Sequence, residues 1–507
     1  MKSILLFLLF FAMAYPYTLP DATSRVLVFS DQMNESPGTA NFTFNATHYV
    51  GMQKVDKARI DAYRQINSNF IVLQYHKAYG TDLGGNITNA TPPYWNNDCD
   101  TFYAWVSRHP SYGSLESYYI HSGGVIDSAH RVQHFWNNAL EYYLADLRTD
   151  GWKNYVAEVT SSRCSAIGFD GTFYDAAYFP NYGYVPANWC ETAPFNAPAF
   201  TQFGPTWNNS FAVPYFAFIR NYYHSGGRNQ LCIVNCDQMI TGWYDDAYMD
   251  STDGGMVEGF FTYGNRLTGS DWQLSASRIL KYMTGAGKNK VMLAQCSPGE
   301  TDLLQRRWCI ANYLLIKNKY SYYNNAYGSA SNWWPEYEIN LGNFSSQPAG
   351  LSDLLVSGTT SLYKRDYAAG LVLVNPGAAA QNFTLIGNYQ PITFSGGGNV
   401  NNGIVPPSSL LTYGTAVSGA VTVNPGEALI LQKVVNPVVE SPPGQHPSEN
   451  RGLLVKIYSI SGKRVATLKS GAGRFLPGTL GLKSGIYFAV TESRNTKTPI
   501  QKLVVLK

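Results

Sequence analysis

The sequence predicts an α/β fold, a (β/α)8 TIM barrel, followed by an antiparallel β-sandwich and a small C-terminal β-domain. Three observations predict this order. Eight short apolar runs alternate with longer amphipathic stretches in the first part of the chain. After residue 342 the pattern of apolar residues changes to short alternating runs, and a last β-rich segment follows a proline-rich stretch. At 507 residues the chain is long enough for two to four domains.

The first 14 residues have the pattern of a secretory signal peptide. Lys2 precedes an apolar run over residues 4–11, and Ala12 and Ala14 form a small-x-small pair. The run is too short to cross a bilayer, and no later segment approaches the roughly 20 apolar residues of a transmembrane helix. We therefore expect residues 1–14 to be removed and the mature protein to be soluble and exported.

The barrel is predicted over residues 24–342. Runs rich in β-branched and aromatic residues alternate there with helix candidates such as residues 132–152 and 217–226, which indicates parallel strands with crossover helices. Eight repeats favour a closed barrel, because an open sheet gives no reason to stop at eight. The predicted strands are residues 25–31, 70–76, 117–121, 171–176, 231–236, 254–260, 290–296 and 320–325.

Three further segments follow the predicted barrel. Residues 343–436 contain short alternating runs separated by Gly, Pro and Asn, which predict the β-sandwich. Residues 437–450 are rich in proline, serine and charge, which is typical of a linker. Residues 451–507 form the last β-rich segment.

Composition narrows the class of ligand. Charged residues make up only 14% of the chain and aromatic residues another 14%, a mixture that suits stacking and hydrogen bonding to sugars as well as an aromatic core. The net charge of +3 comes without a basic block, so no nucleic-acid partner is expected. No CxxC pair or His-rich segment occurs, and no metal or organic cofactor is implied.

Polar residues stand at the C-terminal ends of the predicted strands, where the active sites of such barrels lie. Two of them, Asp175 and Glu258, are acids on the fourth and sixth strands, so they can face one another and flank a single bond. Glu258 lies in an apolar run, and burial is expected to raise its pKa as a general acid requires. The strand-end residues are Asp31, His76, His121, Asp175, Asn235, Glu258 and Gln295.

Other candidates are weighed against structural roles. His76 and His121 are candidates to contact sugar hydroxyls. A structural role, with each ring hydrogen-bonded inside the protein, is an equal alternative. Asp170 precedes the fourth strand and is expected to be a turn or capping residue at the opposite end. Either Glu336 or Glu338 is a rival second acid, with loop packing favoured. The candidate stacking platforms, with an ordinary aromatic core as the alternative, are Tyr75, Trp243, Trp333 and Trp334.

The last 57 residues carry a family resemblance. The segments KIYSISGK (456–463), GLKSGIYFAV (481–490) and KLVVLK (502–507) resemble the C-terminal sorting domain of the type IX secretion system. This resemblance implies interaction with the type IX secretion machinery, passage through the periplasm, removal of the tail, and release or attachment at the cell surface. A generic small β-domain is the alternative.

A second resemblance covers residues 25–433. GFDGTFYDAAY (168–178) looks like the DG-x-F-x-D segment of hypothetical glycoside hydrolase barrels, and WWPEYEINLG (333–342) followed by LYKRDYAAGLVLVNP (362–376) resembles their passage into a β-sandwich. The barrel resembles polygalactosaminidase-type and α-galactosidase-type barrels more distantly. Their acids follow the fourth and sixth strands, which implies catalytic roles for Asp175 and Glu258.

The leading hypothesis is therefore a secreted glycoside hydrolase that cleaves an extracellular polysaccharide with two carboxylates. Asp175 would be the nucleophile or base and Glu258 the acid, with Asn235 and Gln295 positioning hydroxyls. The rival is a non-catalytic glycan-binding or adhesion protein whose acids lie too far apart or in salt bridges, and a lyase with a His base is a third possibility. GxSxG, HExxH, P-loop and GxGxxG motifs are absent.

Overall fold

The structure is a computed structural model. It describes residues 19–81, 99–121, 125–136, 139–177, 207–240 and 246–434, and residues 454–459, 464–469, 485–493, 496–497 and 501–505 near the C-terminus. The chain divides into two compact units, Met1–Val434 and Val435–Lys507. The predicted signal peptide and linker lie outside the described residues.

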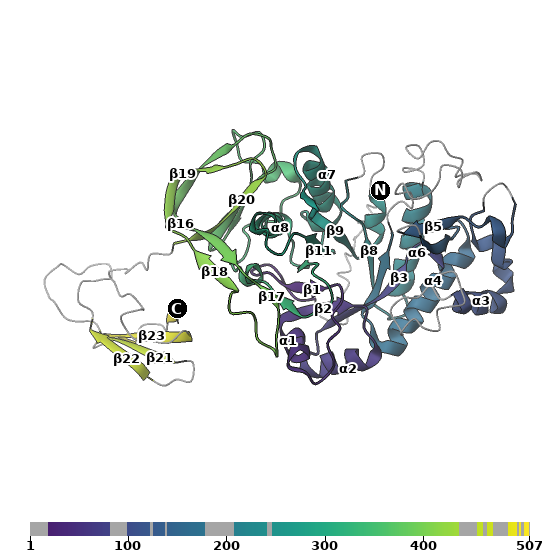
Figure 1. Ribbon diagram of the computed structural model, residues 1–507, viewed down its shortest axis with the longest axis horizontal. Helices are drawn as coiled ribbons and strands as arrows, with labels where there is room; N and C mark the ends of the chain where they lie inside the picture. The colour runs from purple at the N-terminus through teal and green to yellow at the C-terminus, as the bar shows by residue number, and fades with distance from the viewer. Residues whose placement is uncertain are drawn as a thin grey trace, which may run out of the picture. The chain divides into compact units, whose positions relative to one another are not determined.

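Eight parallel strands close into a barrel, as the sequence predicts (Figure 1). They follow one another around the ring in chain order, and pairing of β12 with β1 and of β9 with β8 completes the closure. The strands are β1 (Val28–Ser30), β2 (Tyr49–Gln53), β3 (Ile71–Lys77), β7 (Gly171–Asp175), β8 (Leu231–Asn235), β9 (Gly254–Tyr263), β11 (Val291–Ser297) and β12 (Ser321–Asn325).

Helices connect most successive strands and cover the outside of the barrel, and a 3-10 turn (Ala247–Ser251) lies between β8 and β9. Several begin at a side-chain cap: Thr39, Asp56 and Asp302 each accept a hydrogen bond from a backbone N–H of the first turn. The helices are α1 (Ala40–His48), α2 (Lys57–Ile66), α4 (Asp150–Arg163), α6 (Val213–His224), α7 (Gly269–Ile279) and α8 (Leu303–Ile316). No helix among the described residues has both the length and the apolar character needed to cross a bilayer.

Two sequence predictions about single elements are wrong. Residues 117–121 are not a barrel strand, since Leu115–Tyr118 forms a 3-10 turn, and the second strand is instead β2. It escaped notice because it follows α1 without a polar break and contains a glycine. The predicted helix 132–152 is a hairpin of β5 (Gln133–Trp136) and β6 (Ala139–Leu144) followed by the start of α4.

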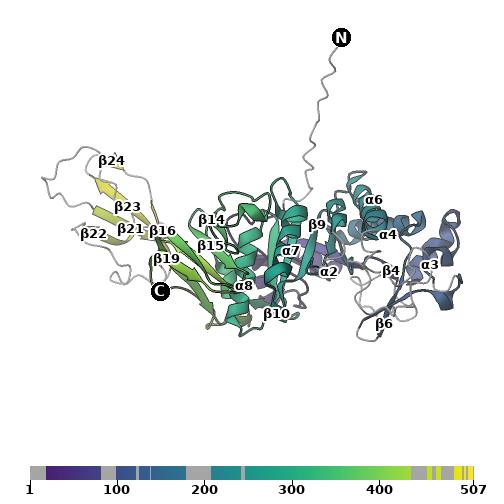
Figure 2. The same cartoon turned by 90° about the horizontal axis from the view of Figure 1, so that it is seen from above.

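This hairpin belongs to an insertion between β3 and α4. It forms a three-stranded sheet with β4 (Gly80–Thr81), accompanied by α3 (Cys99–Arg108). In both views α3 lies on the side of the barrel away from β16 (Figure 2).

The side chains form two apolar layers around the barrel strands. Inside the barrel, Leu73, Phe173, Ile233 and Met256 belong to one buried cluster, while alternate residues of the same strands pack outward against the helices. This period-two division is the ordinary pleat of a strand with both faces covered.

The β-sandwich packs against α8 through residues of its first strand. Arg365 donates to the Leu314 and Lys317 carbonyls, and Tyr367 donates to the Leu314 carbonyl. The long β16 (Gln381–Ser395) pairs with β19 along its first part and β18 along its second. The other strands are β14 (Tyr363–Tyr367), β15 (Gly370–Asn375), β18 (Leu410–Tyr413), β19 (Val417–Val423) and β20 (Glu427–Lys433), with short pairs at β10 (Asn265–Arg266), β13 (Asn332–Trp333) and β17 (Gly398–Asn399).

The second unit is a small antiparallel sheet, in agreement with the predicted C-terminal β-domain. Its central strand β23 pairs with β21, β24 and β25, and β21 also pairs with β22. The strands are β21 (Leu454–Ser459), β22 (Arg464–Lys469), β23 (Gly485–Ser493), β24 (Thr496–Lys497) and β25 (Gln501–Val505).

Candidate active site

A ring of polar residues lies at the C-terminal ends of the barrel strands. Seven of its eight residues follow a residue of the interior apolar cluster by two positions, and Gln53 follows Gly51, so the strand pleat turns them toward the barrel axis. Below the ring the interior is apolar, and polar side chains there would have no partners. One residue comes from each strand, in chain order Asp31, Gln53, Tyr75, Asp175, Asn235, Glu258, Gln295 and Asn324.

The two predicted catalytic acids share one hydrogen-bond donor. Asn235 Nδ2 donates to Asp175 Oδ1 at 2.8 Å and to Glu258 Oε2 at 2.6 Å. Because both bonds begin at the same nitrogen, the two oxygens can lie no farther apart than the sum of these lengths. Both side chains are only partly buried. The fold thus brings together acids that are distant in sequence.

The second oxygen of Asp175 has a separate partner. The Tyr75 hydroxyl donates to Asp175 Oδ2 from the neighbouring strand β3. A phenol bound to one oxygen and an amide bound to the other fix the plane of the carboxylate. The structure therefore holds Asp175 through uncharged donors.

Asp31, which directly follows β1, pairs with two residues at the end of β2. Its carboxylate accepts from Gln53 Nε2 and forms an ion pair of 2.8 Å with Lys54, whose ammonium also lies 5.0 Å from the centre of the Tyr75 ring. Lys54 thus links Asp31 to the tyrosine that holds Asp175.

Burial has a strong effect on Glu258. Desolvation is the largest contribution, and with the negative charges of Asp175, Asp31 and Asp237 it raises the pKa of Glu258 to about 7, although the Asn235 hydrogen bond partly opposes it. A carboxyl group with this pKa is protonated below neutral pH and can serve as a general acid.

The backbone is strained where several strands leave the ring. Lys54, Ala176, Asp237 and Phe261 have φ angles of 62°, 51°, 50° and 52°, a region that residues with a Cβ rarely adopt. Such conformations cost on the order of 1 kcal/mol each and persist where the surroundings fix them. Three of them follow the ends of β2, β7 and β8, and Phe261 lies in the last part of β9, so the strain is concentrated at the end of the barrel that carries the ring.

Gln295 and Asn324 complete the ring on adjacent strands and lie opposite each other in the β11–β12 register. Each is 8% exposed. Gln295 is also in register with Glu258. Uncharged amides therefore flank the acid pair on this side.

The structure does not bring the two predicted histidines to the ring. His76 lies on the outward face of β3, where it is fully buried beside Tyr174 and burial lowers its pKa to about 3. Alternation along the strand explains this, because its neighbour Tyr75 faces inward. His121 lies in the insertion, bound to Glu116.

Two of the three tryptophans predicted to stack on sugars lie among the described residues, and both belong to the packed interior. Trp333 and Trp334 are 7% and 2% exposed, and their ring nitrogens donate to Glu338 and Asn332. Neither ring face is open, which corrects the stacking interpretation for both. Trp243 lies outside the described residues.

The rival acid Glu336 is a structural group. It is fully buried and forms a two-pronged ion pair with Arg306 at 2.9 and 2.5 Å, with a further hydrogen bond from Asn325. Its carboxylate is thus fully engaged, in agreement with loop packing.

Gln53, Lys54 and Asn324 were missed by sequence reasoning. Gln53 and Lys54 belong to the unrecognised β2, while Asn324 follows an aromatic run that resembles core. The signal that identifies Asn324 is its position two residues after the inward-facing Tyr322.

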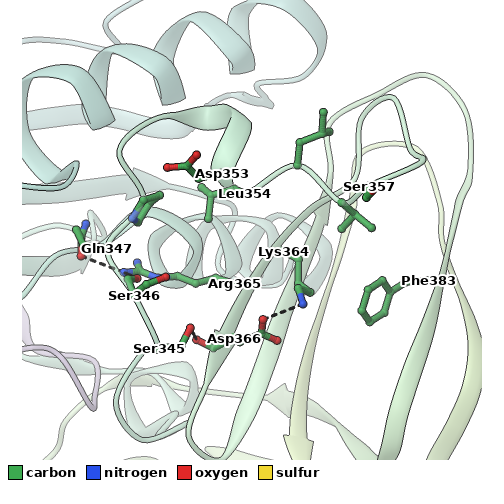
Figure 3. Close-up of a pocket in the computed structure, with 13 residues that line it drawn as sticks. Ser345, Ser346, Gln347, Asp353, Leu354, Ser357, Lys364, Arg365, Asp366 and Phe383 are labelled. Carbon is green, nitrogen blue, oxygen red and sulfur yellow. Dashed lines mark hydrogen bonds and ion pairs between the residues drawn. The ribbon is translucent and has the colours of Figure 1, made fainter.

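A separate hollow lies on the β-sandwich (Figure 3). It has a volume of about 580 Å³ and is lined by Gln347, Lys364 and Asp366 among others. Lys364 and Asp366 pair with each other at 2.8 Å. None of the ring residues lines it.

Comparison with known proteins gives one family and several solved structures. Residues 64–371, more than half of the chain, match the model of hypothetical glycosyl hydrolase family 15. No curated protein matches the chain.

Several solved structures are similar to this chain at low identity. A maltogenic α-amylase from Thermotoga neapolitana is 10% identical over 81% of this chain and 99% of its own, with a TM-score of 0.38. A pullulanase from Bacillus acidopullulyticus is 10% identical over 83% of this chain and 62% of its own, with a TM-score of 0.41. A cycloisomaltooligosaccharide glucanotransferase from Paenibacillus sp. is 12% identical over 81% of this chain and 55% of its own, with a TM-score of 0.36. This chain thus spans only about half of the length of the glucanotransferase.

Proposed function

Because the chain belongs to hypothetical glycosyl hydrolase family 15, we propose that it hydrolyses glycosidic bonds of an extracellular polysaccharide with Asp175 and Glu258 as its two carboxylates. The observation that carries the proposal is the shared Asn235 amide, which holds both acids at one point of the barrel mouth. A single glycosidic bond fits between two carboxylates so placed.

The spacing supports a retaining mechanism. Retaining enzymes keep their carboxyl groups about 5–5.5 Å apart, whereas inverting enzymes need about 6.5–9.5 Å to admit a water. Two oxygens bound to one nitrogen at 2.8 and 2.6 Å fit the shorter class. Asp175 is then close enough to attack the sugar directly.

In the first step an oxygen of Asp175 forms a bond to the anomeric carbon as the bond to the leaving oxygen breaks. Glu258, protonated below neutral pH, gives its proton to that oxygen. In the second step Glu258 takes a proton from water, and the resulting hydroxide displaces Asp175 from the anomeric carbon. Tyr75 and Asn235 hold Asp175 throughout.

The test is reducing-sugar release from a panel of plant, algal and bacterial polysaccharides, with Asp175→Asn and Glu258→Gln alongside. We expect release that either substitution abolishes while circular dichroism stays unchanged. Proton NMR should show that the first-formed product has the same anomeric configuration as the substrate. Glycan binding without release, or release that both variants retain, would favour the non-catalytic alternative or a different site.

We also propose that the protein is exported and that residues 451–507 direct it to the type IX secretion machinery. The signal-like first 14 residues and the KIYSISGK and GLKSGIYFAV segments support this. Deletion of residues 451–507 should leave the protein in the periplasm of a host that has this machinery. Unchanged amounts outside the cell would contradict the proposal.

A further inference from the structure

Two side-chain amides of the ring have no hydrogen-bond partner among the described residues. Within the part of the chain that the structure describes, neither the Gln295 nor the Asn324 side chain makes a hydrogen bond, although each residue is only 8% exposed. Gln295 Oε1 in particular is a buried acceptor without a partner. The next residue, Asn325, illustrates the usual condition, because its amide donates to Glu336. Buried polar groups are nearly always paired, and an unpaired one costs about 1–3 kcal/mol.

The other donors of the ring are already engaged. Asn235 donates to Asp175 and Glu258, and the Tyr75 hydroxyl donates to Asp175. Gln53 Nε2 donates to Asp31. A ligand at the acid pair therefore meets the Gln295 and Asn324 amides as its available partners on the β11–β12 side.

The charges around the acid pair are mostly negative. Four carboxylates stand here, since Asp175, Asp31 and Asp237 all raise the pKa of Glu258. The described cations are Lys54, paired with Asp31, and Lys77 at the end of β3, whose ammonium lies over the Tyr142 ring. A sugar carboxylate would add a like charge to this cluster, and among the described residues both of these cations already have a partner.

We infer that Gln295 and Asn324 bind two hydroxyl groups of the sugar that Asp175 attacks, and that this sugar is neutral and not a uronate. The inference rests on the proposed function. Each amide offers one acceptor and one donor pair, which matches hydroxyl groups that both donate and accept. A site built for hydroxyls rejects analogues that lack them, because its buried amides then stay unpaired.

The first experiment uses the mature enzyme and whichever polysaccharide it cleaves. Gln295→Met and Asn324→Leu should each lower kcat/KM by about 10- to 100-fold, with part of the loss in kcat because these contacts tighten in the transition state. Gln381→Met, on the surface of β16, is the matched control and should leave both constants unchanged. Gln295→Glu keeps the shape and tests the role if the apolar variants unfold.

The outcomes separate the two proposals. Absence of cleavage of every glycan by the wild type overturns the hydrolase and with it this inference. Cleavage that the Gln295 and Asn324 variants retain in full overturns the inference alone. The second readout is the new reducing end, identified by mass spectrometry after borodeuteride reduction, because that residue occupied the attacked position. A neutral sugar supports the inference, and a uronic acid there overturns it.

Discussion

Acids stand at both ends of the barrel, and their surroundings differ between the two ends. At the N-terminal end Asp253 is fully buried and paired with Arg220 at 2.7 Å and His224 at 2.9 Å, and it also accepts from the Cys232 N–H. Burial alone would raise the pKa of Asp253, but His224 and Arg220 outweigh it and lower the pKa. At the C-terminal end Glu258 receives an amide hydrogen bond and has three acids near it, and its pKa is raised to about 7.

Asp170 extends the comparison along a single strand. It precedes β7 and binds Arg64 and the Val72 N–H, whereas Asp175 at the other end of β7 binds only uncharged donors among the described residues. Cations and backbone N–H groups therefore close the lower end of the barrel. The upper end leaves its acids reactive, which lowers stability and makes proton transfer and attack available.

The largest expected effect is on activity and contrasts Asp175 with Asp170. Asp175→Asn should lower kcat by at least about 10³-fold because the amide cannot attack the sugar. Asp170→Asn should leave kcat near the wild-type value and lower the free energy of unfolding by about 1–3 kcal/mol through the lost Arg64 pair. Rates of sugar release and urea denaturation of both variants check this. Equal loss of activity in the two would break the comparison.

The next effect concerns stability at the lower end. Asp253→Asn should lower the free energy of unfolding by about 3–5 kcal/mol, because Arg220 and His224 lose their buried partner. The pKa of Asp253 is lower folded than unfolded, so its contribution is present above the ordinary value of 3.8 and is lost as pH falls through the folded pKa. The deficit should therefore shrink in acid. Asp61→Asn, in an exposed ion pair with Lys57, is the control and should change little.

A smaller effect of the opposite sign is expected for Glu258. Its pKa is about 7 folded against 4.5 unfolded, so the folded state binds more protons between these values and stability falls as pH rises through this window. Glu258→Gln removes this loss and should raise the free energy of unfolding by about 2–3 kcal/mol at pH 8, with little change at pH 4. Urea denaturation at the two pH values measures it. Glu300→Gln, at an exposed position, should be neutral at both.

The smallest effect is on the pH profile. Activity should fall above about pH 7 as Glu258 loses the proton that it must donate. Asp31→Asn removes one of the charges that raise the pKa of Glu258, so the basic limb of kcat/KM should move down by about half a pH unit. If the midpoint of this limb stays at the same pH or moves to a higher pH, Asp31 does not act on Glu258 through its charge.

Much of the fold was predictable because its signals are local. Apolar runs with strand period marked seven of the eight barrel strands, and Asp175 and Glu258 were placed correctly near their ends. The strand β2 escaped because a glycine and a preceding helix hid its pattern, and with it Gln53 and Lys54 were lost. His76 was misplaced even though alternation after Tyr75 already assigns it to the outward face.

The sequence by itself determined the barrel, the sandwich and the two acids, because period and composition act over a few residues. Only the tertiary structure decided that Asn235 donates to both acids and that Trp333 and Trp334 are buried. It also decided that Gln295 and Asn324 lie in register on adjacent strands with no hydrogen-bond partner among the described residues. These facts depend on closure of the barrel, which joins residues up to several hundred positions apart. No local pattern specifies which of them meet.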